Sequence, residues 1–291
     1  MIYASAPGKV NLFFEVGPLR ADGFHSVVSL YQSLAIRQRV GVEPSEHWEV
    51  QTIGNLPKAQ LDLVPTGEQN LVVVAAKALA GQVGIENPQP MRFETVKEVP
   101  VAAGLAGGSA DAAAALVALN EAWCLGLSRQ ELMRVGAKVG SDVPFALLGG
   151  TALGLDTGIE LETLEDLPRT QVVLGVSSFG LSTARVFQRF DELFPQGDQS
   201  ISGAVLKEQL ASGTLPLGKN SLQAAATSLR PELAELFAEL GAGFALSGSG
   251  PTIYLATQDI AAADAADQRM RELGLFVIRT ETAQAGAALE S

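Results

Sequence analysis

Residues 99–120, VPVAAGLAGGSADAAAALVALN, set the most flexible residues of the chain directly against its best helix formers. Glycines stand at Gly104, Gly107 and Gly108, and alanine dominates the segment after Ser109. We predict a helix from about residue 109 to 125, entered through a bend that glycine permits because it has no Cβ. The first amides of a helix lack intrahelical partners and carry partial positive charge, so such a bend can hold an anion. The alternative is that the glycines only let a strand and a helix pack closely.

Common glycine-rich signatures do not fit this segment. A Walker A loop ends in Gly-Lys-Ser/Thr, whereas Gly108 is followed by Ser109 and Ala110. The spacing of the glycines does not match the dinucleotide fingerprint Gly-x-Gly-x-x-Gly. A nucleophile elbow, Gly-x-Ser-x-Gly, fails because Asp111 stands where its last glycine belongs. A phosphate site here would be built from main-chain amides rather than from a lysine.

The charge balance limits the partners of the chain. It has 20 Lys and Arg residues against 32 Asp and Glu, a formal net charge of −12. This balance argues against a broad surface for nucleic acid or for an anionic membrane. An acidic protein that binds phosphates must use local backbone dipoles and a few well-placed cations.

The single cysteine, Cys124, excludes an internal disulfide and indicates a reducing compartment, so we expect a cytoplasmic protein. Cys124 stands in an apolar helical pattern, which predicts a buried thiol. The opening residues, MIYASAPGKVNLFF, lack the regions of a signal peptide, and no apolar run reaches membrane length.

Strand and helix patterns mix along the chain without strict alternation, which favours an α+β fold. The expected strands lie at residues 2–7, 9–16, 26–42, 48–53, 93–99, 151–155 and 171–176, on both sides of SGSGPT (residues 247–252), and at the end of the chain. Further helices are expected at residues 70–84, 128–140, 183–194, 201–212 and 231–240, after Pro144 and before the last strand. The acidic, proline-containing segment 161–169 predicts a domain boundary, with domains at residues 1–162 and 163–291.

Two more segments carry small residues and a proline beside strand patterns: SAPGKVNLFFEV at residues 5–16 and LSGSGPTIYLAT at residues 246–257. Together with PVAAGLAGGSADAA at residues 100–113, they resemble the three motifs of the GHMP kinase superfamily, whose phosphate loop has no Walker lysine. The resemblance implies a two-domain α+β fold with the active site in the interdomain cleft. It also implies an ATP-dependent small-molecule kinase that uses Mg²⁺.

Three other segments narrow the resemblance: RADGFHSVVSLYQSL, GSDVPFALLGGTALGLDTG and NSLQAAATSLRPEL. They are similar to the branch that phosphorylates a cytidine diphosphate-linked methylerythritol, at its 2-hydroxyl, in the non-mevalonate isoprenoid pathway. This small molecule and ATP are the implied partners, while the oligomeric state and the Mg²⁺ ligands are left open. The alternatives are a kinase for another alcohol, such as mevalonate or homoserine, and a nucleotide-binding protein without catalysis.

The resemblance also assigns the catalytic residues. Asp142 is implied to be the base that accepts the proton of the substrate hydroxyl. Lys9 would hold that carboxylate ionised and offset charge on the attacking oxygen. Asn11, on the same strand face as Lys9, would bind the substrate or the same carboxylate. The plainer readings are an Asp142 that caps the helix started by Pro144, and a Lys9 that reaches solvent.

ATP is expected on the loop before the long helix and beside Asn70, which is otherwise a helix cap. The residues of that loop are Pro100, Val101, Ala102, Ala103, Gly104, Leu105, Ala106, Gly107, Gly108 and Ser109. Ala103 and Ala106 occupy places where relatives often carry glycine, so a negative φ is expected at both.

The implied substrate-binding residues are Asn11, Phe24, His25, Thr183, Phe187, Gly248, Ser249 and Gly250. His25 would read the cytosine edge. Phe24, which stands where relatives commonly have tyrosine, and Phe187 would cover its two faces. Phe187 fits a protein core equally well, and residues 247–252 fit a tight hairpin turn.

Overall fold

Two long antiparallel strands, β1 (Ile2–Leu19) and β2 (His25–Pro44), form the spine of the molecule. The computed structural model describes residues 1–290. The strands pair from Ile2 opposite Val42 to Leu19 opposite His25. Their register shifts between Pro7 and Lys9 and again between Asn11 and Phe13. Such bulges re-aim neighbouring side chains, and here they bracket Lys9 and Asn11, the two polar residues expected in the active site.

β1 and β2 lie within a seven-stranded sheet, in the order β11-β1-β2-β4-β3, with β5 paired to β2 and β6 to β5. Only β3 and β4 run parallel among the pairs of this sheet within residues 1–290. The remaining strands are β3 (Glu49–Gly54), β4 (Met91–Lys97), β5 (Thr151–Leu155), β6 (Glu160–Thr163) and β11 (Ala288–Leu289).

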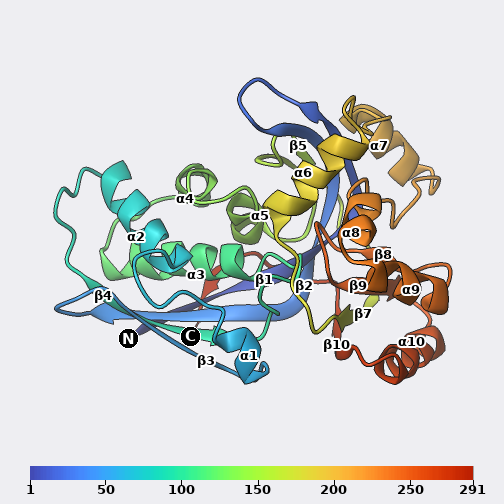
Figure 1. Cartoon of the computed structure of the whole chain (residues 1–291). Coiled ribbons are helices and arrows are strands. Elements are labelled where there is room, and N and C mark those ends of the chain that lie inside the picture. Colours follow the sequence, from blue (N-terminus) through green and yellow to red (C-terminus); the bar gives the residue numbers. More distant parts are fainter. Residues whose placement is uncertain (291) are drawn as a thin grey trace.

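The alanine-rich helix α3 (Gly107–Ala122) packs directly on β1 and β2. Alanine gives a helix with high propensity and little side-chain bulk, so the helix can approach the sheet closely along most of its length. Around it lie α2 (Leu71–Gln82), α4 (Arg129–Ala137) and α5 (Val143–Leu148), while α1 (Lys58–Leu61) sits at the end of β3 (Figure 1).

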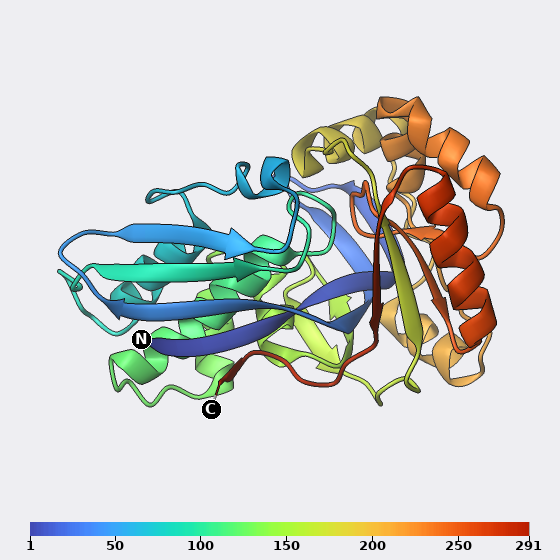
Figure 2. The same ribbon diagram turned by 90° about the horizontal axis from the view of Figure 1, so that it is seen from below.

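The second half of the chain contributes a four-stranded antiparallel sheet in the order β10-β7-β9-β8. Its strands are β7 (Gln171–Val176), β8 (Ala245–Leu246), β9 (Ile253–Thr257) and β10 (Phe276–Glu281). Its helices are α6 (Thr183–Leu193), α7 (Gly203–Ala211), α8 (Gln223–Leu229), α9 (Pro231–Leu240) and α10 (Ile260–Glu272). Figure 2 shows α9 and α10 on the outer side of this half.

The strands β1 and β2 contribute side chains to the apolar cores of both halves. Phe14, Val16 and Val27, from β1 and β2, are part of the same apolar core as α6, α8 and α10. After β10 the chain returns along the edge of the first sheet, where β11 pairs with β1 and brings the two termini close together (Figure 2). The expected division at residue 162 falls within β6, a strand of the first sheet, before the chain enters the second sheet at β7, and we keep it as a proposal.

Most elements match the sequence prediction, including the mixed α+β class. The predicted strands at residues 2–7 and 9–16 are one strand, and α1, α8, β6 and β11 were not predicted. The prediction of a buried Cys124 is wrong: it follows the end of α3, is exposed, and has a φ of +51°. None of the helices within residues 1–290 combines the length and apolarity needed to span a bilayer.

Candidate active site

A cavity of about 830 Å³ opens between the two halves of the molecule. Segments far apart in the chain line it: β1, the turn between β1 and β2, the loop before α3, the start of α5, one face of α6, and the turn between β8 and β9. All three segments that resemble kinase motifs therefore contribute to one site.

The loop before α3 forms one wall of the cavity. Pro100, Ala102, Ala103, Gly104, Ala106, Gly107, Gly108 and Ser109 line it. The other two residues expected there do not: Leu105 is fully buried in the core, and Val101 is held through its amide by Gln60 Oε1 at 3.2 Å. α3 begins at Gly107 without a side-chain cap, so its positive end faces the cavity through main-chain groups alone.

Two alanines in this loop have left-handed backbone conformations. The φ angle is +52° at Ala102 and +56° at Ala106, the residue that precedes α3. The expected negative φ at Ala106 is therefore wrong, whereas Ala103 is not among the residues with positive φ. A left-handed conformation costs an alanine about 1 kcal/mol, and the packing of the loop must offset this cost.

Lys9 and Asp142 meet in the cavity. Lys9 Nζ lies 3.7 Å from Asp142 Oδ2 and donates a hydrogen bond to Asn11 Oδ1 at 2.7 Å. Only 5% of Lys9 is exposed, so this lysine does not reach solvent. Asp142 precedes α5, but its side chain makes no capping hydrogen bond and is free to face the cavity.

Asn11 and Tyr31 complete the surroundings of this ion pair. Asn11 Nδ2 donates to Ser29 Oγ at 2.8 Å, which fixes the amide so that its oxygen accepts from Lys9. Tyr31 lies on β2 with its ring 5.7 Å from Lys9 Nζ. Burial and the nearby Asp142 carboxylate raise the pKa of Tyr31 well above its ordinary value, so its hydroxyl stays protonated.

The turn between β8 and β9 faces the glycine loop. Ser247 Oγ donates to the Gly104 carbonyl at 2.9 Å, and Gly248, Ser249 and Gly250 line the cavity. Asn220 Nδ2 holds the turn by donating to the carbonyls of Leu246 and Gly248, each at 2.8 Å. Residues 247–252 are thus a hairpin turn and a wall of the site at once.

At the turn between β1 and β2, His25 packs against α6. Its ring centroid lies 5.2 Å from that of Phe187, and Phe24 is 57% exposed. His25 Nδ1 is 2.9 Å from the Gly17 carbonyl oxygen, and Nε2 is 3.3 Å from Asp191 Oδ1. Both ring nitrogens therefore face protein oxygens.

Phe187 combines both roles expected of it, because it lines the cavity while packing on the core of the second half. Thr183, at the start of α6, joins the turn through a contact of 2.9 Å between its Oγ1 and Ser249 Oγ.

Comparison with known proteins places this arrangement in a family. Residues 70–150 match the family model described as GHMP kinases N terminal domain, and residues 193–274 match that of GHMP kinases C terminal. A 4-diphosphocytidyl-2-C-methyl-D-erythritol kinase from Pseudarthrobacter chlorophenolicus is 36% identical, over 100% of this chain and 95% of its own length. The kinase of the same name from Rhodococcus jostii is 42% identical, over 98% of this chain and 92% of its own.

The chain belongs to the 4-diphosphocytidyl-2-C-methyl-D-erythritol kinase family of GHMP kinases. A crystal structure of 4-(cytidine 5'-diphospho)-2C-methyl-D-erythritol kinase superposes with a TM-score of 0.74 at 28% identity, over 97% of this chain and 100% of that one. A homoserine kinase from Cytophaga hutchinsonii gives a TM-score of 0.71 at 18% identity, over 99% and 97% of the two chains, and shares the GHMP kinase fold alone.

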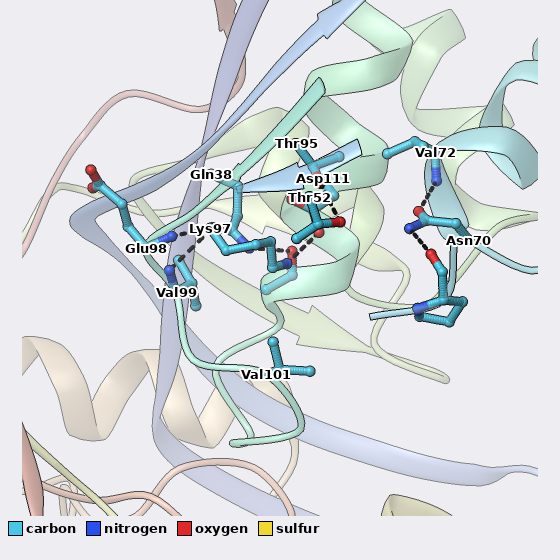
Figure 3. A network of polar contacts seen from close by, with 12 residues as sticks. Gln38, Thr52, Asn70, Val72, Thr95, Lys97, Glu98, Val99, Val101 and Asp111 are labelled. Carbon is cyan, nitrogen blue, oxygen red and sulfur yellow. Dashed lines mark hydrogen bonds and ion pairs between the residues drawn. The ribbon is translucent and has the colours of Figure 1, made fainter. Parts of the chain in front are cut away.

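In this GHMP kinase, Asn70 lies outside the cavity lining. Its Oδ1 accepts from the Val72 amide at 3.0 Å and its Nδ2 donates to the Pro65 carbonyl at 2.7 Å, so it caps α2 (Figure 3). The contact with adenine expected of it stays a prediction.

A buried polar network lies behind the glycine loop (Figure 3). Gln38 Oε1 accepts from the amides of Glu98 and Val99 at 2.9 and 3.1 Å, and these residues lead into the loop. Lys97 forms a buried ion pair with Asp111 in the first turns of α3. Burial raises the pKa of Asp111, although Lys97 opposes the shift. Asp111 does not line the cavity.

Sequence analysis missed several polar residues of the cavity of this kinase. Tyr31, Ser141, Thr157, Gln188 and Asp191 all line it. Ser141 adjoins Asp142, and Asp191 lies four residues after Phe187, a spacing that places both on one helix face. This spacing was the available signal for Asp191, whereas Tyr31 and Thr157 depend on how the strands pair.

Proposed function

We propose that this kinase transfers the γ-phosphoryl group of ATP to a hydroxyl of 4-diphosphocytidyl-2-C-methyl-D-erythritol, at its 2-position, in the non-mevalonate isoprenoid pathway. The observation that carries the proposal is the ion pair of Lys9 with Asp142, at 3.7 Å, in a cavity walled by the uncapped start of α3. A non-catalytic nucleotide-binding protein has no need of a buried lysine aimed at a carboxylate.

Asp142 is proposed to accept the proton of the attacking hydroxyl. Its carboxylate makes no capping bond, so its oxygens are available to orient that hydroxyl. Lys9 offers positive charge to the carboxylate and to the attacking oxygen, while Asn11 fixes the direction of the ammonium group. Phosphoryl transfer depends mainly on such positioning and charge stabilisation.

The triphosphate is proposed to lie on the loop at residues 100–109. The positive end of α3, a helix of 16 residues, offers amides there in a chain with a net charge of −12. The facing turn, tied to Gly104 through Ser247, closes the opposite side. These main-chain donors replace the lysine of a Walker loop.

Mg²⁺ fits the donors at this site. Within residues 1–290 no three His, Cys, Asp or Glu side chains gather into a metal cage. Mg²⁺ accompanying a nucleotide typically keeps several waters and uses one or two protein oxygens besides the phosphates. The Ser109 hydroxyl, in the cavity lining, is the side-chain group that would hold it, together with phosphate oxygens and waters. The ion would neutralise charge on the transferred phosphoryl group.

The cytidine end is proposed to lie between Phe24 and Phe187. Phe24 lines the cavity and is largely exposed. A base that stacks on this ring would bury apolar surface of both groups, which supports this placement. The proposed partners, ATP and a diphosphate-linked sugar alcohol, carry charges that confine them to the compartment where they are made, and we place the enzyme in the cytoplasm.

The test is ATP consumption by the purified protein with the cytidine-linked methylerythritol, mevalonate and homoserine in separate reactions. We expect ADP only with the cytidine-linked substrate, and phosphorus NMR should find the new phosphate on its 2-hydroxyl. Turnover of mevalonate or homoserine at an equal rate would overturn the substrate assignment, and no turnover of any alcohol would overturn the kinase assignment.

A further inference from the structure

A strap of chain, residues 282–290, leaves the second sheet after β10 and runs along the edge of the first sheet, where its residues 288–289 form β11 (Figure 2). Its main chain is hydrogen-bonded to both halves of the molecule. The Thr282 amide donates to the Thr170 carbonyl at 3.0 Å, and the Ala283 amide donates to the Ser33 carbonyl at 2.9 Å. The strap therefore follows a fixed path between the two halves.

The strap contacts the carboxyl end of α5. The Ala287 amide donates to the Ala146 carbonyl at 2.9 Å, which satisfies one of the last carbonyls of this helix. Gly286 lies so close that a Cβ there would stand 2.2 Å from the Leu147 carbonyl oxygen and 2.5 Å from that of Leu148. Gly286 is buried and is not among the residues with positive φ, so its lack of a side chain serves this close approach.

Arg37, on β2, holds the strap against β1. Its Nη1 donates to the Ala285 carbonyl at 3.1 Å, and its Nη2 donates to the carbonyls of Gly286 and Ser5 at 2.8 and 2.9 Å. Its Nε donates to Ser5 Oγ at 3.0 Å. The rigid fork of a guanidinium group lets one side chain hold both segments at once. Ser5 lies on β1, which also carries Lys9, so the strap is tied to the strand that presents this lysine.

The strap thus joins the two elements that carry the proposed catalytic pair. Asp142 directly precedes α5, a helix of six residues packed through Phe145 on the ring of Tyr31, with the centroids 4.9 Å apart. Because protein interiors are close-packed, a displacement at one end of so short a helix moves its other end. We propose that the strap is a positioning element of the active site, which holds α5 against β1 and so sets the Asp142 carboxylate beside Lys9. This inference rests on the proposed function, because it takes Asp142 as the base.

Gly286→Ala tests the proposal by forcing the strap and α5 apart. The new Cβ would meet backbone carbonyls, so one of the two segments must move. We expect kcat for the cytidine-linked substrate to fall about tenfold to a hundredfold, the cost of a misplacement on the order of 1 Å. The Kd for ATP, measured by calorimetry, should change by less than about threefold, because the donors proposed for the phosphates are amides of another segment and the strap does not line the cavity.

Two control variants separate positioning from stability. Gly81→Ala makes the same change on α2, at an exposed glycine where a Cβ would meet open space, and should keep kcat. Leu233→Ala removes a fully buried side chain from α9 and should lower the unfolding temperature while kcat is unchanged. Activities are compared at a temperature where circular dichroism shows every variant folded. An equal loss of kcat in Leu233→Ala and Gly286→Ala would show that the strap contributes stability alone.

A double-mutant cycle asks whether the strap acts through Asp142. If it acts by placing the carboxylate, Gly286→Ala should lower kcat no further in the Asp142→Asn background. A further fall as large as that in wild type would overturn the proposal, as would an unchanged kcat in Gly286→Ala when Asp142→Asn is inactive. If Asp142→Asn itself keeps the wild-type kcat, the proposed function loses its base.

Arg37 provides a second route to the same test should Gly286→Ala fail to fold. Arg37→Met removes all the hydrogen bonds of the guanidinium group, whereas Arg37→Lys keeps the charge without the fork, so kcat should fall in the first and partly recover in the second. Amide hydrogen exchange across residues 143–148 needs no turnover and should be faster in Gly286→Ala and Arg37→Met than in wild type or Gly81→Ala. Unchanged exchange in the folded variants would overturn the hold of the strap on α5, whatever alcohol the enzyme phosphorylates.

Discussion

Lys9 illustrates how one residue can be costly for folding and useful for chemistry. A buried ammonium group loses its hydration, and only well-placed partners make this tolerable. Lys9 has the Asn11 oxygen at 2.7 Å and the Asp142 carboxylate at 3.7 Å. Because the second distance is longer than a direct hydrogen bond, Asp142 keeps acceptor capacity for a substrate hydroxyl.

Replacing Asp142 with Asn tests this division of roles. The amide keeps the shape but cannot accept the hydroxyl proton, so kcat should fall about 10²- to 10⁴-fold. ATP affinity, measured by calorimetry, should change by less than about threefold, because the donors proposed for the phosphates are main-chain amides. Asp62→Asn, at an exposed carboxylate paired with Lys58, is the control and should keep full activity. A kcat within tenfold of wild type would exclude Asp142 as the base.

At the scale of elements, the site depends on two turns that touch. Gly104 has a φ of +75°, and a Cβ there would lie 2.1 Å from the Ser247 carbonyl oxygen. Neither atom belongs to a flexible side chain, so any larger residue must push the loop before α3 away from the turn between β8 and β9. The contact holds the third kinase motif, at residues 246–257, against the glycine loop.

Gly104→Ala should therefore destabilise the protein by about 2 kcal/mol or more, the sum of a left-handed alanine and the displaced backbone. KM for ATP should rise about tenfold, because a shift near 1 Å misplaces the phosphate donors. Urea unfolding and steady-state kinetics measure the two effects. Ala106→Gly, the reverse change in the same loop at a φ of +56°, should cost no stability. If Gly104→Ala and Ala106→Gly changed the free energy of unfolding and the KM for ATP equally, the close contact of Gly104 with Ser247 would not be their cause.

Local signals in the sequence predicted the helices at residues 70–84 and 128–140. In the structure Asn70 caps α2, and Ser128 and Glu131 form the capping box that starts α4. What the sequence could not provide was the pairing of distant segments. Nothing local to residues 288–289 indicates that they pair with β1, and the left-handed φ at Ala106 is imposed by the packing of its loop. Tyr31 was missed for the same reason, because its place in the cavity depends on the pairing of β1 with β2.

At the scale of the whole molecule, β1 belongs to both halves, and Glu15 anchors it to the second. The side chain is fully buried and accepts from the Ser200 hydroxyl and from the amides of Ser200 and Ile201, at 2.6, 2.7 and 3.1 Å, and it pairs with Lys219. Burial alone would raise the pKa of this carboxyl, but Lys219 and these hydrogen bonds outweigh it and lower the pKa. The cavity lies between the halves that this anchor joins.

Glu15→Gln should destabilise the protein by about 2 kcal/mol at pH 7, since the partly exposed Lys219 loses its charged partner and the new amide donor meets the amide donors of Ser200 and Ile201. The folded-state pKa lies below the ordinary value of 4.5, so the stabilisation by Glu15 is fully present above pH 4.5 and is lost as the pH falls through the folded-state pKa. The difference in unfolding free energy between wild type and variant, measured with urea, should stay constant from pH 7 to pH 5 and shrink below 4.5.

Glu162→Gln, at an exposed pair with Lys207, should lose less than about 1 kcal/mol at every pH. A difference that grows on acidification would mean that Glu15 is protonated in the folded state and does not anchor the two halves by charge.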